Sequence, residues 1–295
     1  MSAGARGAWE PTRLERLRAR TRDVYQKGRI HSARLARHAT RGKQVTSRVM
    51  LALVLGLALA VVTADAPALP LTLGVPAYFY PTPTDESWRQ LADAPSGTIV
   101  IVNPASGPGP SVDARYEATM SALEAAGCVP YGYVDTAYAN RDPDQIIAEA
   151  RQFHSWYGIE AIFLDQTAPS ATHLDYYRAI VSQLHADGFD VAMNPGQPEV
   201  DPRYLDLVEH VVLFEGPYET YLAASFPTWV ADYPAAKAWH LVYEVSDSAA
   251  MANVVRLARA RHAGVVYATD GGMPNPWQSW PPYWDAERRL TQSGR

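Results

Sequence analysis

Eight short apolar runs alternate with stretches of helical pattern between residues 74 and 290, and this alternation limits the folds that the chain can adopt. Runs that are apolar throughout are typical of strands in a parallel sheet whose two faces are both covered. The runs span residues 74–80, 98–103, 129–134, 161–165, 190–194, 210–215, 238–243 and 264–268, and the helical patterns lie near 84–94, 113–126, 142–157, 172–187, 201–208, 217–234, 247–262 and 278–290. Eight such units in about 220 residues fit a closed barrel better than an open sheet, so the sequence predicts an α/β fold, a single-domain (β/α)8 TIM-type barrel over residues 74–291.

Residues that begin and end helices stand at the expected boundaries. Side chains suited to helix N-termini precede several of the helical patterns, and glycines follow several of them. These residues are Asp113, Asp142, Thr172, Asp201 and Ser246 or Asp247 at the starts, with Gly127, Gly158, Gly188 and Gly264 at the ends. The local signals therefore agree with the predicted barrel.

Charge divides the chain into two segments of opposite sign. Residues 1–48 carry 13 Lys and Arg against 3 Asp and Glu, whereas the remaining residues carry 13 against 28. An uncharged run rich in Leu, Val and Ala follows the basic segment directly. A basic flank before an apolar run is typical of a cytoplasmic N-terminus, so we expect the acidic barrel domain to be extracytoplasmic.

The apolar run allows two interpretations. Residues 1–48 are predicted as a basic cytoplasmic tail or a long signal n-region, 49–66 as a signal-peptide hydrophobic region or an uncleaved signal anchor, and 67–73 as a spacer. The uncharged part is slightly short for a spanning helix, which needs about 17 to 25 residues, and the leader is long for a signal peptide. The protein is then either secreted or anchored to the cell membrane. Nucleic-acid binding by the Arg-rich tail is an alternative, but the neighbouring apolar run favours a role in topology, and we expect no nucleic-acid partner.

Two of the predicted strands end on a carboxylate, Asp165 and Glu215. The C-terminal strand ends of such a barrel carry the active site, so the two acids are expected at the same end. Acids on next-but-one strands start roughly 10 Å apart at the backbone and can converge to about 5 to 6 Å, the spacing of a retaining glycosidase. The sequence predicts Asp165 as nucleophile or stabiliser and Glu215 as general acid/base. The alternative is that each carboxylate caps a helix or pairs with Arg141 or Arg178.

Other polar and aromatic residues gather at the predicted strand ends, in the mixture of amides, carboxylates and rings that suits a sugar ligand. We expect substrate binding by Tyr80, Asn103, Asp135, Tyr138, Arg141, Gln166, Asn194, His240, Asp270 and Trp277. Stacking on sugar faces is the role expected for Tyr80, Tyr138 and Trp277. For His240 a satisfied position in the core is the alternative.

The chain lacks the residue patterns of metal sites, internal disulfides and serine hydrolases. The eight histidines are scattered without a metal-binding pair, so we expect no metal and no cofactor. The single cysteine, Cys128, cannot form an internal disulfide and is interpreted as buried filler. No Gly-x-Ser-x-Gly motif is present, which argues against a serine hydrolase.

Six short motifs are distributed in order over the predicted barrel. They are Pro76–Pro81 (PAYFYP), Asn103–Gly109 (NPASGPG), Gly132–Tyr138 (GYVDTAY) with Arg141, Ile162–Asp165 (IFLD), Asn194–Gly196 (NPG) and Phe214–Glu215. With these motifs the chain resembles the spherulin-4 (spherulation-specific family 4) group of proteins from about residue 74 to 290. The resemblance implies a (β/α)8 barrel and places the family's strand-four Asp at Asp165 and its strand-six Glu at Glu215.

The resemblance also implies a substrate. Characterised members of the family are glycoside hydrolases that cut α-1,4-linked N-acetylgalactosamine in cationic exopolysaccharides such as galactosaminogalactan, with kinship to hydrolases of the Pel polysaccharide. Hydrolytic members often have Asp-Glu after strand four, whereas this chain has Asp165 followed by Gln166, which keeps hydrogen bonds but lacks the charge. The acidic body of the chain agrees with a cationic, partly deacetylated substrate.

These observations predict a monomeric, exported glycoside hydrolase that acts endo on a galactosamine-containing polysaccharide. One alternative is a catalytically inactive carbohydrate-binding surface protein of the same fold, favoured if Gln166 marks lost chemistry. Another alternative is a polysaccharide deacetylase, which would require a metal ion.

Overall fold

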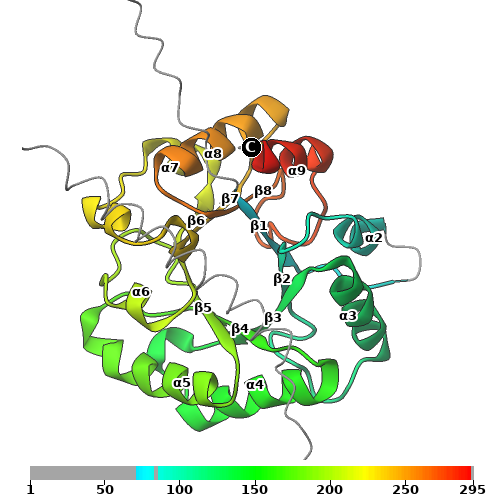
Figure 1. Ribbon diagram of the computed structural model, residues 1–295, viewed down its shortest axis with the longest axis vertical. Helices are drawn as coiled ribbons and strands as arrows, with labels where there is room; N and C mark the ends of the chain where they lie inside the picture. The colour runs from blue at the N-terminus through cyan, green and yellow to red at the C-terminus, as the bar shows by residue number, and fades with distance from the viewer. Residues whose placement is uncertain (1–70, 83–85, 294–295) are drawn as a thin grey trace, which may run out of the picture. The chain divides into compact units, whose positions relative to one another are not determined.

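The structured part of the chain is a closed barrel of eight parallel strands, which confirms the predicted fold class (Figure 1). The computed structural model describes residues 71–82 and 86–293. The predicted basic segment 1–48, the predicted hydrophobic segment 49–66 and residues 67–70 of the predicted spacer lie outside the described residues. In Figure 1 the helices form a ring outside the strands, from cyan β1 to red α9.

Strands and helices alternate along the barrel. The strands are β1 (Thr72–Ala77), β2 (Ile99–Val102), β3 (Val129–Asp135), β4 (Ala161–Asp165), β5 (Asp190–Met193), β6 (His210–Pro217), β7 (Ala238–Tyr243) and β8 (Val265–Ala268). The helices are α2 (Glu86–Ala92), α3 (Ala114–Ala126), α4 (Pro143–Tyr157), α5 (Leu174–Ala186), α6 (Tyr204–Leu207), α7 (Tyr218–Ala223), α8 (Ser248–Ala260) and α9 (Trp284–Gln292), with 3-10 turns η1 (Ala137–Ala139), η2 (Ala171–His173), η3 (Thr228–Asp232) and η4 (Ala235–Lys237).

The barrel starts earlier than predicted. Thr72 and Leu73 pair with Val265 and Val266 of β8 and thereby close the barrel, so the predicted boundary at Gly74 was wrong. Leu73 is 1% exposed, and residues that bury such side chains belong to the core rather than to a spacer. The end of the predicted spacer 67–73 is therefore part of β1.

Two of the predicted helices are shorter than their patterns. The pattern at 217–234 contains α7 and then the 3-10 turn η3, and the pattern at 201–208 contains the four-residue α6. Pro227 precedes η3 and Pro234 precedes η4. A proline lacks the N–H that continues a helix, which explains the interruption.

Most of the predicted helix boundaries are confirmed. Capping by a side chain or a left-handed glycine occurs at Asp113, Asp142 and Asp247 and at Gly127 and Gly158. The predicted cap at Thr172 was wrong, because Ser170 accepts from Thr172 N at the start of η2. Asp201 accepts from Arg203 N at 3.0 Å through its Oδ1, in the turn that leads into α6.

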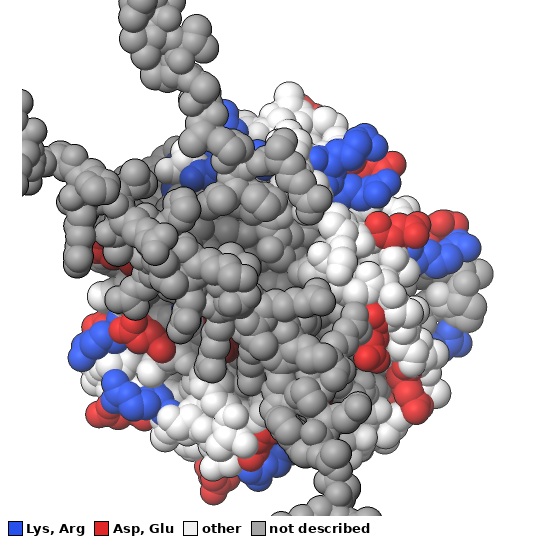
Figure 2. Space-filling view, viewed as in Figure 1, with Lys and Arg blue, Asp and Glu red and all other residues white. Residues whose placement is uncertain are grey.

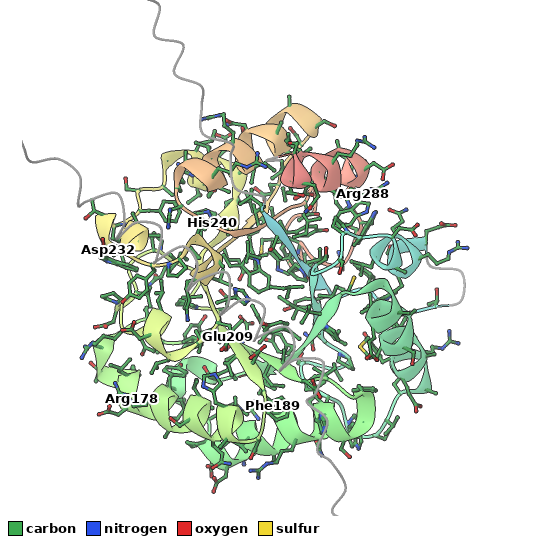
Figure 3. The ribbon with its side chains drawn as sticks, viewed as in Figure 1. Arg178, Phe189, Glu209, Asp232, His240 and Arg288 are labelled. Carbon is green, nitrogen blue, oxygen red and sulfur yellow. The ribbon has the colours of Figure 1, made fainter. Side chains whose placement is uncertain are left out.

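Large aromatic side chains fill the interior of the barrel, as the sticks of Figure 3 show within the ring of strands. Trp239 is fully buried, and its ring centroid lies 5.5 Å from that of Phe163. Gly74 faces this indole, and a Cβ added there would overlap the Trp239 ring. The absence of a side chain at Gly74 is therefore what allows the tryptophan to occupy the barrel.

Charged residues of both signs are mixed on the surface. Figure 2 shows acidic and basic side chains next to each other around the visible edge of this face. Ion pairs such as Arg151–Asp187 at 2.7 Å account for part of this mixing. Within residues 71–82 and 86–293, no helix combines the length and the apolar character needed to cross a membrane.

Candidate active site

A pocket of about 630 Å³ opens at the C-terminal ends of the strands. Its floor includes Phe163 and Leu241, which are both 1% exposed. Its polar and aromatic lining consists of Tyr78, Asn103, Ser106, Tyr138, Asp165, Gln166, Asn194, Glu215, Tyr243, Asn275 and Trp277. We call this the strand-end pocket.

Three successive strands bring Asp165, Asn194 and Glu215 together in the pocket. Asp165 ends β4, Asn194 follows β5, and Glu215 lies in β6. The side-chain amide of Asn194 donates one hydrogen bond to Asp165 Oδ1 at 2.7 Å and another to Glu215 Oε2 at 2.6 Å. Asp165 Oδ1 and Glu215 Oε2 thus lie no farther apart than these two hydrogen bonds together, which excludes the about 6.5 to 9.5 Å of inverting glycosidases and favours the shorter spacing of retaining ones.

A second donor reaches the other oxygen of each of the two acids. Tyr133 of β3 donates its hydroxyl hydrogen to Asp165 Oδ2 at 2.8 Å. The indole Nε1 of Trp277, in the loop between β8 and α9, donates to Glu215 Oε1 at 3.2 Å. Each carboxyl group therefore accepts a hydrogen bond at both of its oxygens.

A bulge in β6 sets the direction of Glu215. The register between β6 and β7 shifts between Val212 and Phe214, after which Glu215 pairs with Leu241. The Glu215 amide also donates to the carbonyl of Gly196 at 3.0 Å, in the loop that carries Asn194. Bulges of this kind often re-aim side chains next to active sites, and here the shift brings Glu215 into the pocket.

The environment raises the pKa values of both acids. Burial raises the pKa of Glu215 to about 7, and the negative charge of Asp165 adds to the effect, while Asn194 and Trp277 oppose it. Burial also raises the pKa of Asp165, against the hydrogen bonds from Tyr133, the Gln166 backbone and Asn194. A carboxyl group with a pKa near neutrality can donate a proton at physiological pH, so Glu215 has the property of a general acid.

Gln166, which follows Asp165 in the chain, and Tyr138 both line the wall of the pocket. Gln166 has a left-handed backbone, with φ of 49°, and its carbonyl accepts a hydrogen bond from Tyr138 N at 2.7 Å. Tyr138 is itself left-handed, with φ of 54°, and its side chain is 58% exposed. Such a conformation is costly for a bulky residue, and its presence at a pocket is typical of a functional role.

Five of the predicted substrate-binding residues line the pocket and five do not. Those that line it are Asn103, Tyr138, Gln166, Asn194 and Trp277. Those that the structure places elsewhere are Tyr80, Asp135, Arg141, His240 and Asp270.

His240 lies in the wall of the barrel, on the side of β7 that faces α7 (Figure 3). It is fully buried, its Nδ1 lies 2.9 Å from the Tyr221 hydroxyl, and its ring packs on Phe226 at 4.6 Å. Burial and the nearby charge of Arg261 lower its pKa to about 3. The prediction that His240 binds substrate is therefore corrected, and the alternative of a core histidine is the one observed.

Arg141 and Asp135 are engaged with each other beneath the rim. Arg141 donates to Glu149 Oε2 at 3.2 Å and to the Asp135 carbonyl at 2.8 Å. These contacts hold the guanidinium against α4 and outside the pocket lining. Neither Arg141 nor Asp135 lines the strand-end pocket, and together with Glu149 they form an ion-pair network.

Tyr80 and Asp270 lie beyond the ends of their strands. β1 ends at Ala77, and Tyr80 turns away so that its hydroxyl donates to Asp113 Oδ2 at 2.8 Å. β8 ends at Ala268, and the exposed Asp270 is not part of the pocket lining. Tyr78, two residues before Tyr80, lines the pocket instead.

Other residues of the pocket were missed as site residues. Tyr78, Tyr133 and Tyr243 and the loop residues 273–276 are absent from the predicted substrate-binding residues. The alternation of side chains along a strand could have identified Tyr78 and Tyr243, because Pro76 and Leu241 line the same pocket. No such signal exists for the loop.

No group of three or more His, Cys, Asp or Glu within the described ranges is arranged to hold a metal ion. Cys128 is buried and unpaired, as predicted, and burial raises the pKa of its thiol to about 11.

The chain is similar in sequence to a curated protein. Spherulin-4 of Physarum polycephalum is 31% identical to the chain over 215 residues, which are 68% of this chain and 64% of that protein. The chain therefore matches less than two thirds of the length of this curated relative.

Two solved structures share the barrel fold. Aspergillus clavatus Sph3, crystallised in complex with GalNAc, superposes with a TM-score of 0.67 at 23% identity, over 76% of this chain and 98% of that chain. A chitinase from Chromobacterium violaceum ATCC 12472 superposes with a TM-score of 0.52 at 14% identity, also over 76% and 98%.

A sequence profile described as "Spherulation-specific family 4" matches residues 72–289, which include all eight strands. This match agrees with the resemblance carried by the six motifs. The chain therefore belongs to the spherulation-specific family 4.

Proposed function

We propose that this protein is a glycoside hydrolase that cuts N-acetylgalactosamine- or galactosamine-containing polysaccharide at internal bonds. The observation that carries the proposal is the pair of carboxyl groups, Asp165 and Glu215, that share the Asn194 amide inside an open pocket. Two acids held at this spacing are the minimal machinery for hydrolysis with retention of configuration.

The two acids take different roles. In the first step Glu215 gives its proton to the glycosidic oxygen as the bond to C1 breaks, while the Asp165 carboxylate bonds to C1 or stabilises its positive charge. In the second step the ionised Glu215 takes a proton from water, and the water oxygen bonds to C1 and releases the sugar from Asp165. The raised pKa of Glu215, about 7, supports its assignment as the acid.

The pocket lining supports a sugar ligand. The exposed ring of Tyr138 stands at its wall, and Asn103 and Gln166 offer amide groups. The GalNAc bound in Aspergillus clavatus Sph3, a solved structure of the same fold, supports an amino sugar as the ligand class.

The basic leader and the apolar run of residues 49–66 support export of the barrel domain, either secreted or anchored to the membrane. The excess of acidic over basic residues outside the leader supports a cationic, partly deacetylated polymer as substrate.

One observation favours a second candidate, a carbohydrate-binding protein without catalysis. Gln166 lines the pocket immediately after Asp165, at the position where hydrolytic relatives often carry Glu. If that acid is essential to the chemistry, the pocket would bind an amino-sugar polymer without cutting it.

Incubation of the purified protein with galactosamine-containing polymers of different acetylation tests the two candidates. Release of reducing ends is expected for the natural chain, with a fall of about 10²-fold or more for Asp165→Asn and Glu215→Gln. The exposed acids Asp187 and Glu219 provide matched controls as Asp187→Asn and Glu219→Gln. Binding without release of reducing ends by any of the proteins would favour the carbohydrate-binding candidate.

A further inference from the structure

The two acids of the pocket belong to a continuous chain of hydrogen-bonded side chains. Along this chain Tyr133 contacts Asp165, Asp165 contacts Asn194, Asn194 contacts Glu215, and Glu215 contacts Trp277. We call this chain the acid network. Its members come from β3, β4, the loop after β5, β6 and the loop after β8.

Asn194 has no polar atom left with which to bind a sugar. Both hydrogens of its amide are used by Asp165 and Glu215. Its Oδ1 is buried and has no hydrogen-bond partner among the described residues. The residue as a whole is 7% exposed, so the predicted substrate contact through Asn194 has no accessible donor or acceptor.

The orientation of this amide depends on the two acids. If the amide were turned round, Oδ1 of Asn194 would face the ionised carboxylate of Asp165, where two acceptors would meet without a hydrogen. Leaving Oδ1 unpaired in a buried position carries a cost, which the two hydrogen bonds to carboxylates offset. Both N–H groups of the Asn194 amide are therefore held by the two acids.

The indole N–H of Trp277 is held by Glu215 in the same way. It is 5% exposed, so little of its ring can stack on a sugar, and its only donor points at Glu215. The loop holds it in place, because Asn275 Oδ1 accepts from Trp277 N at 3.1 Å and the Trp277 carbonyl accepts from Tyr78 N at 3.3 Å.

We propose, on the basis of the proposed function, that Tyr133, Asn194 and Trp277 are positioning residues that divide the control of the two acids: Tyr133 acts on Asp165, Trp277 on Glu215, and Asn194 on both. None of the three is a substrate ligand. The three donors are neutral, so they orient the carboxyl groups and favour their ionised forms without adding a charge to the pocket.

The titratable groups around the acids are consistent with this division. The titratable side chains near the pair are Tyr78, which follows β1, Tyr133 and Asp135 from β3, and Tyr243 from β7, and the acids also act on each other. Donation from Tyr133 and Asn194 lowers the pKa of Asp165, and donation from Asn194 and Trp277 lowers that of Glu215, in each case against a larger rise caused by burial.

Three variants separate the contributions. Loss of a donor to an ionised carboxyl group raises its pKa, so each loss is expected to move the matching limb of the pH–activity profile upward by about one pH unit. Tyr133→Phe should move the acid limb, Trp277→Phe the alkaline limb, and Asn194→Ala both. All three should lower kcat more than they raise KM, because the groups act on the acids and not on the bound sugar.

Matched controls exist for two of the substitutions. Tyr204 donates its hydroxyl to the Ser170 carbonyl at 2.9 Å, and Trp88 donates its indole to the Phe79 carbonyl at 3.1 Å, both outside the pocket lining. Tyr204→Phe and Trp88→Phe should leave both limbs in place. Since Tyr133→Phe and Trp277→Phe are conservative, they test the proposal even if Asn194→Ala fails to fold.

A titration of the free protein by NMR tests the acid network without requiring turnover. The indole N–H resonance of Trp277, assigned by its loss in Trp277→Phe, is expected to titrate with Glu215 near pH 7, and about one pH unit higher in Asn194→Ala. The carboxyl ¹³C resonance of Asp165, assigned by its loss in Asp165→Asn, reports the pKa of Asp165. This pKa is expected to be about one pH unit higher in Tyr133→Phe.

The outcomes are distinct. The predicted titration shifts without any turnover would support the acid network and contradict the proposed function. Unchanged titrations in Asn194→Ala and Tyr133→Phe, or a rise in KM for Asn194→Ala with both pH limbs in place, would overturn the proposal.

Discussion

Asp165 and Glu215 come from strands that are not neighbours in the barrel, yet their carboxyl groups accept hydrogen bonds from the same amide nitrogen. β5 lies between β4 and β6 and supplies that amide through Asn194. A single uncharged side chain therefore holds two acids close together, and burial, with the nearby charge of Asp165, raises the pKa of Glu215.

The first prediction concerns the pH dependence of hydrolysis. Glu215 must carry a proton and Asp165 must be ionised for the first step, so kcat/KM should fall as pH rises through about 7 and again as pH falls through the raised pKa of Asp165. Initial rates between pH 3 and 9 measure both limbs. A rate that continued to rise above neutral pH would contradict the role of Glu215 as the acid.

A pair of tyrosines tests which residue of the β1 end faces the substrate. Tyr78 lines the pocket, and burial and the charges of Asp165 and Glu215 raise its pKa, whereas the Tyr80 hydroxyl donates to Asp113 outside the pocket. Loss of the hydroxyl in Tyr78→Phe should lower kcat/KM by about tenfold, the value of one hydrogen bond, while Tyr80→Phe should leave it unchanged. A loss of kcat/KM in Tyr80→Phe with none in Tyr78→Phe would contradict the assignment of Tyr78 to the substrate-binding pocket.

Glu287 predicts a pH-dependent stability that does not involve the pocket. It is fully buried on α9, its Oε1 accepts from Ala268 N at 2.7 Å, and burial raises its pKa to about 8. The folded chain keeps the proton below this pH while the unfolded chain loses it above an ordinary value of 4.5, so the stability due to Glu287 falls as pH rises from 4.5 to 8.

Urea unfolding at several pH values checks this expectation. Glu287→Gln removes the titration, so its stability relative to the natural chain should increase between pH 5 and 8 and then level off. Glu219→Gln, at an exposed position, is the control. A difference between Glu287→Gln and the natural chain that did not change with pH would show that Glu287 is ionised in the folded state.

Close packing between β3 and α4 predicts that a substitution at Gly132 lowers the stability of the fold. A Cβ at Gly132 of β3 would lie 2.5 Å from Cγ of the fully buried Phe153. Gly132→Ala should therefore lower the free energy of unfolding by about 1–3 kcal/mol. In the presence of Phe153→Leu, which removes the ring, the cost of Gly132→Ala should shrink. Strictly additive effects in this double-mutant cycle would contradict the steric explanation.

The sequence contains enough information for the barrel and for its two acids. The predicted runs that end on Asp165 and Glu215 are both strands, and Asp165 ends β4, whereas β6 continues past Glu215 to Pro217. The observed bounds of β4 and β7 equal the predicted runs. This succeeded because burial on both faces of a parallel strand leaves a signal within each short run, and the C-terminal ends of the strands must share one side of the barrel.

The direction of individual side chains was harder to predict. His240 follows Trp239 and precedes Leu241, and since Leu241 lines the pocket, alternation along the strand turns His240 toward α7. Position near a strand end is therefore not sufficient to identify a site residue. The direction of its side chain decides the matter, and in β6 this direction also depends on a bulge for which we found no sequence signal.

Contacts between segments that are far apart in the chain could not be predicted from the sequence. Trp277 donates to Glu215 from 62 positions away, in a loop whose backbone accepts a hydrogen bond from Tyr78 N. The sequence predicts Trp277 as a stacking residue, because an exposed ring and a buried indole donor look alike in a sequence.

The anomeric configuration of the first product, followed by ¹H NMR during hydrolysis of a galactosamine-containing oligosaccharide, tests most directly whether Asp165 and Glu215 act together on one glycosidic bond. The account predicts that the newly released reducing end first appears with the configuration of the bond that was cut, as the spacing of the two acids requires. Release of the opposite anomer, or undiminished hydrolysis by Asp165→Asn, would contradict it.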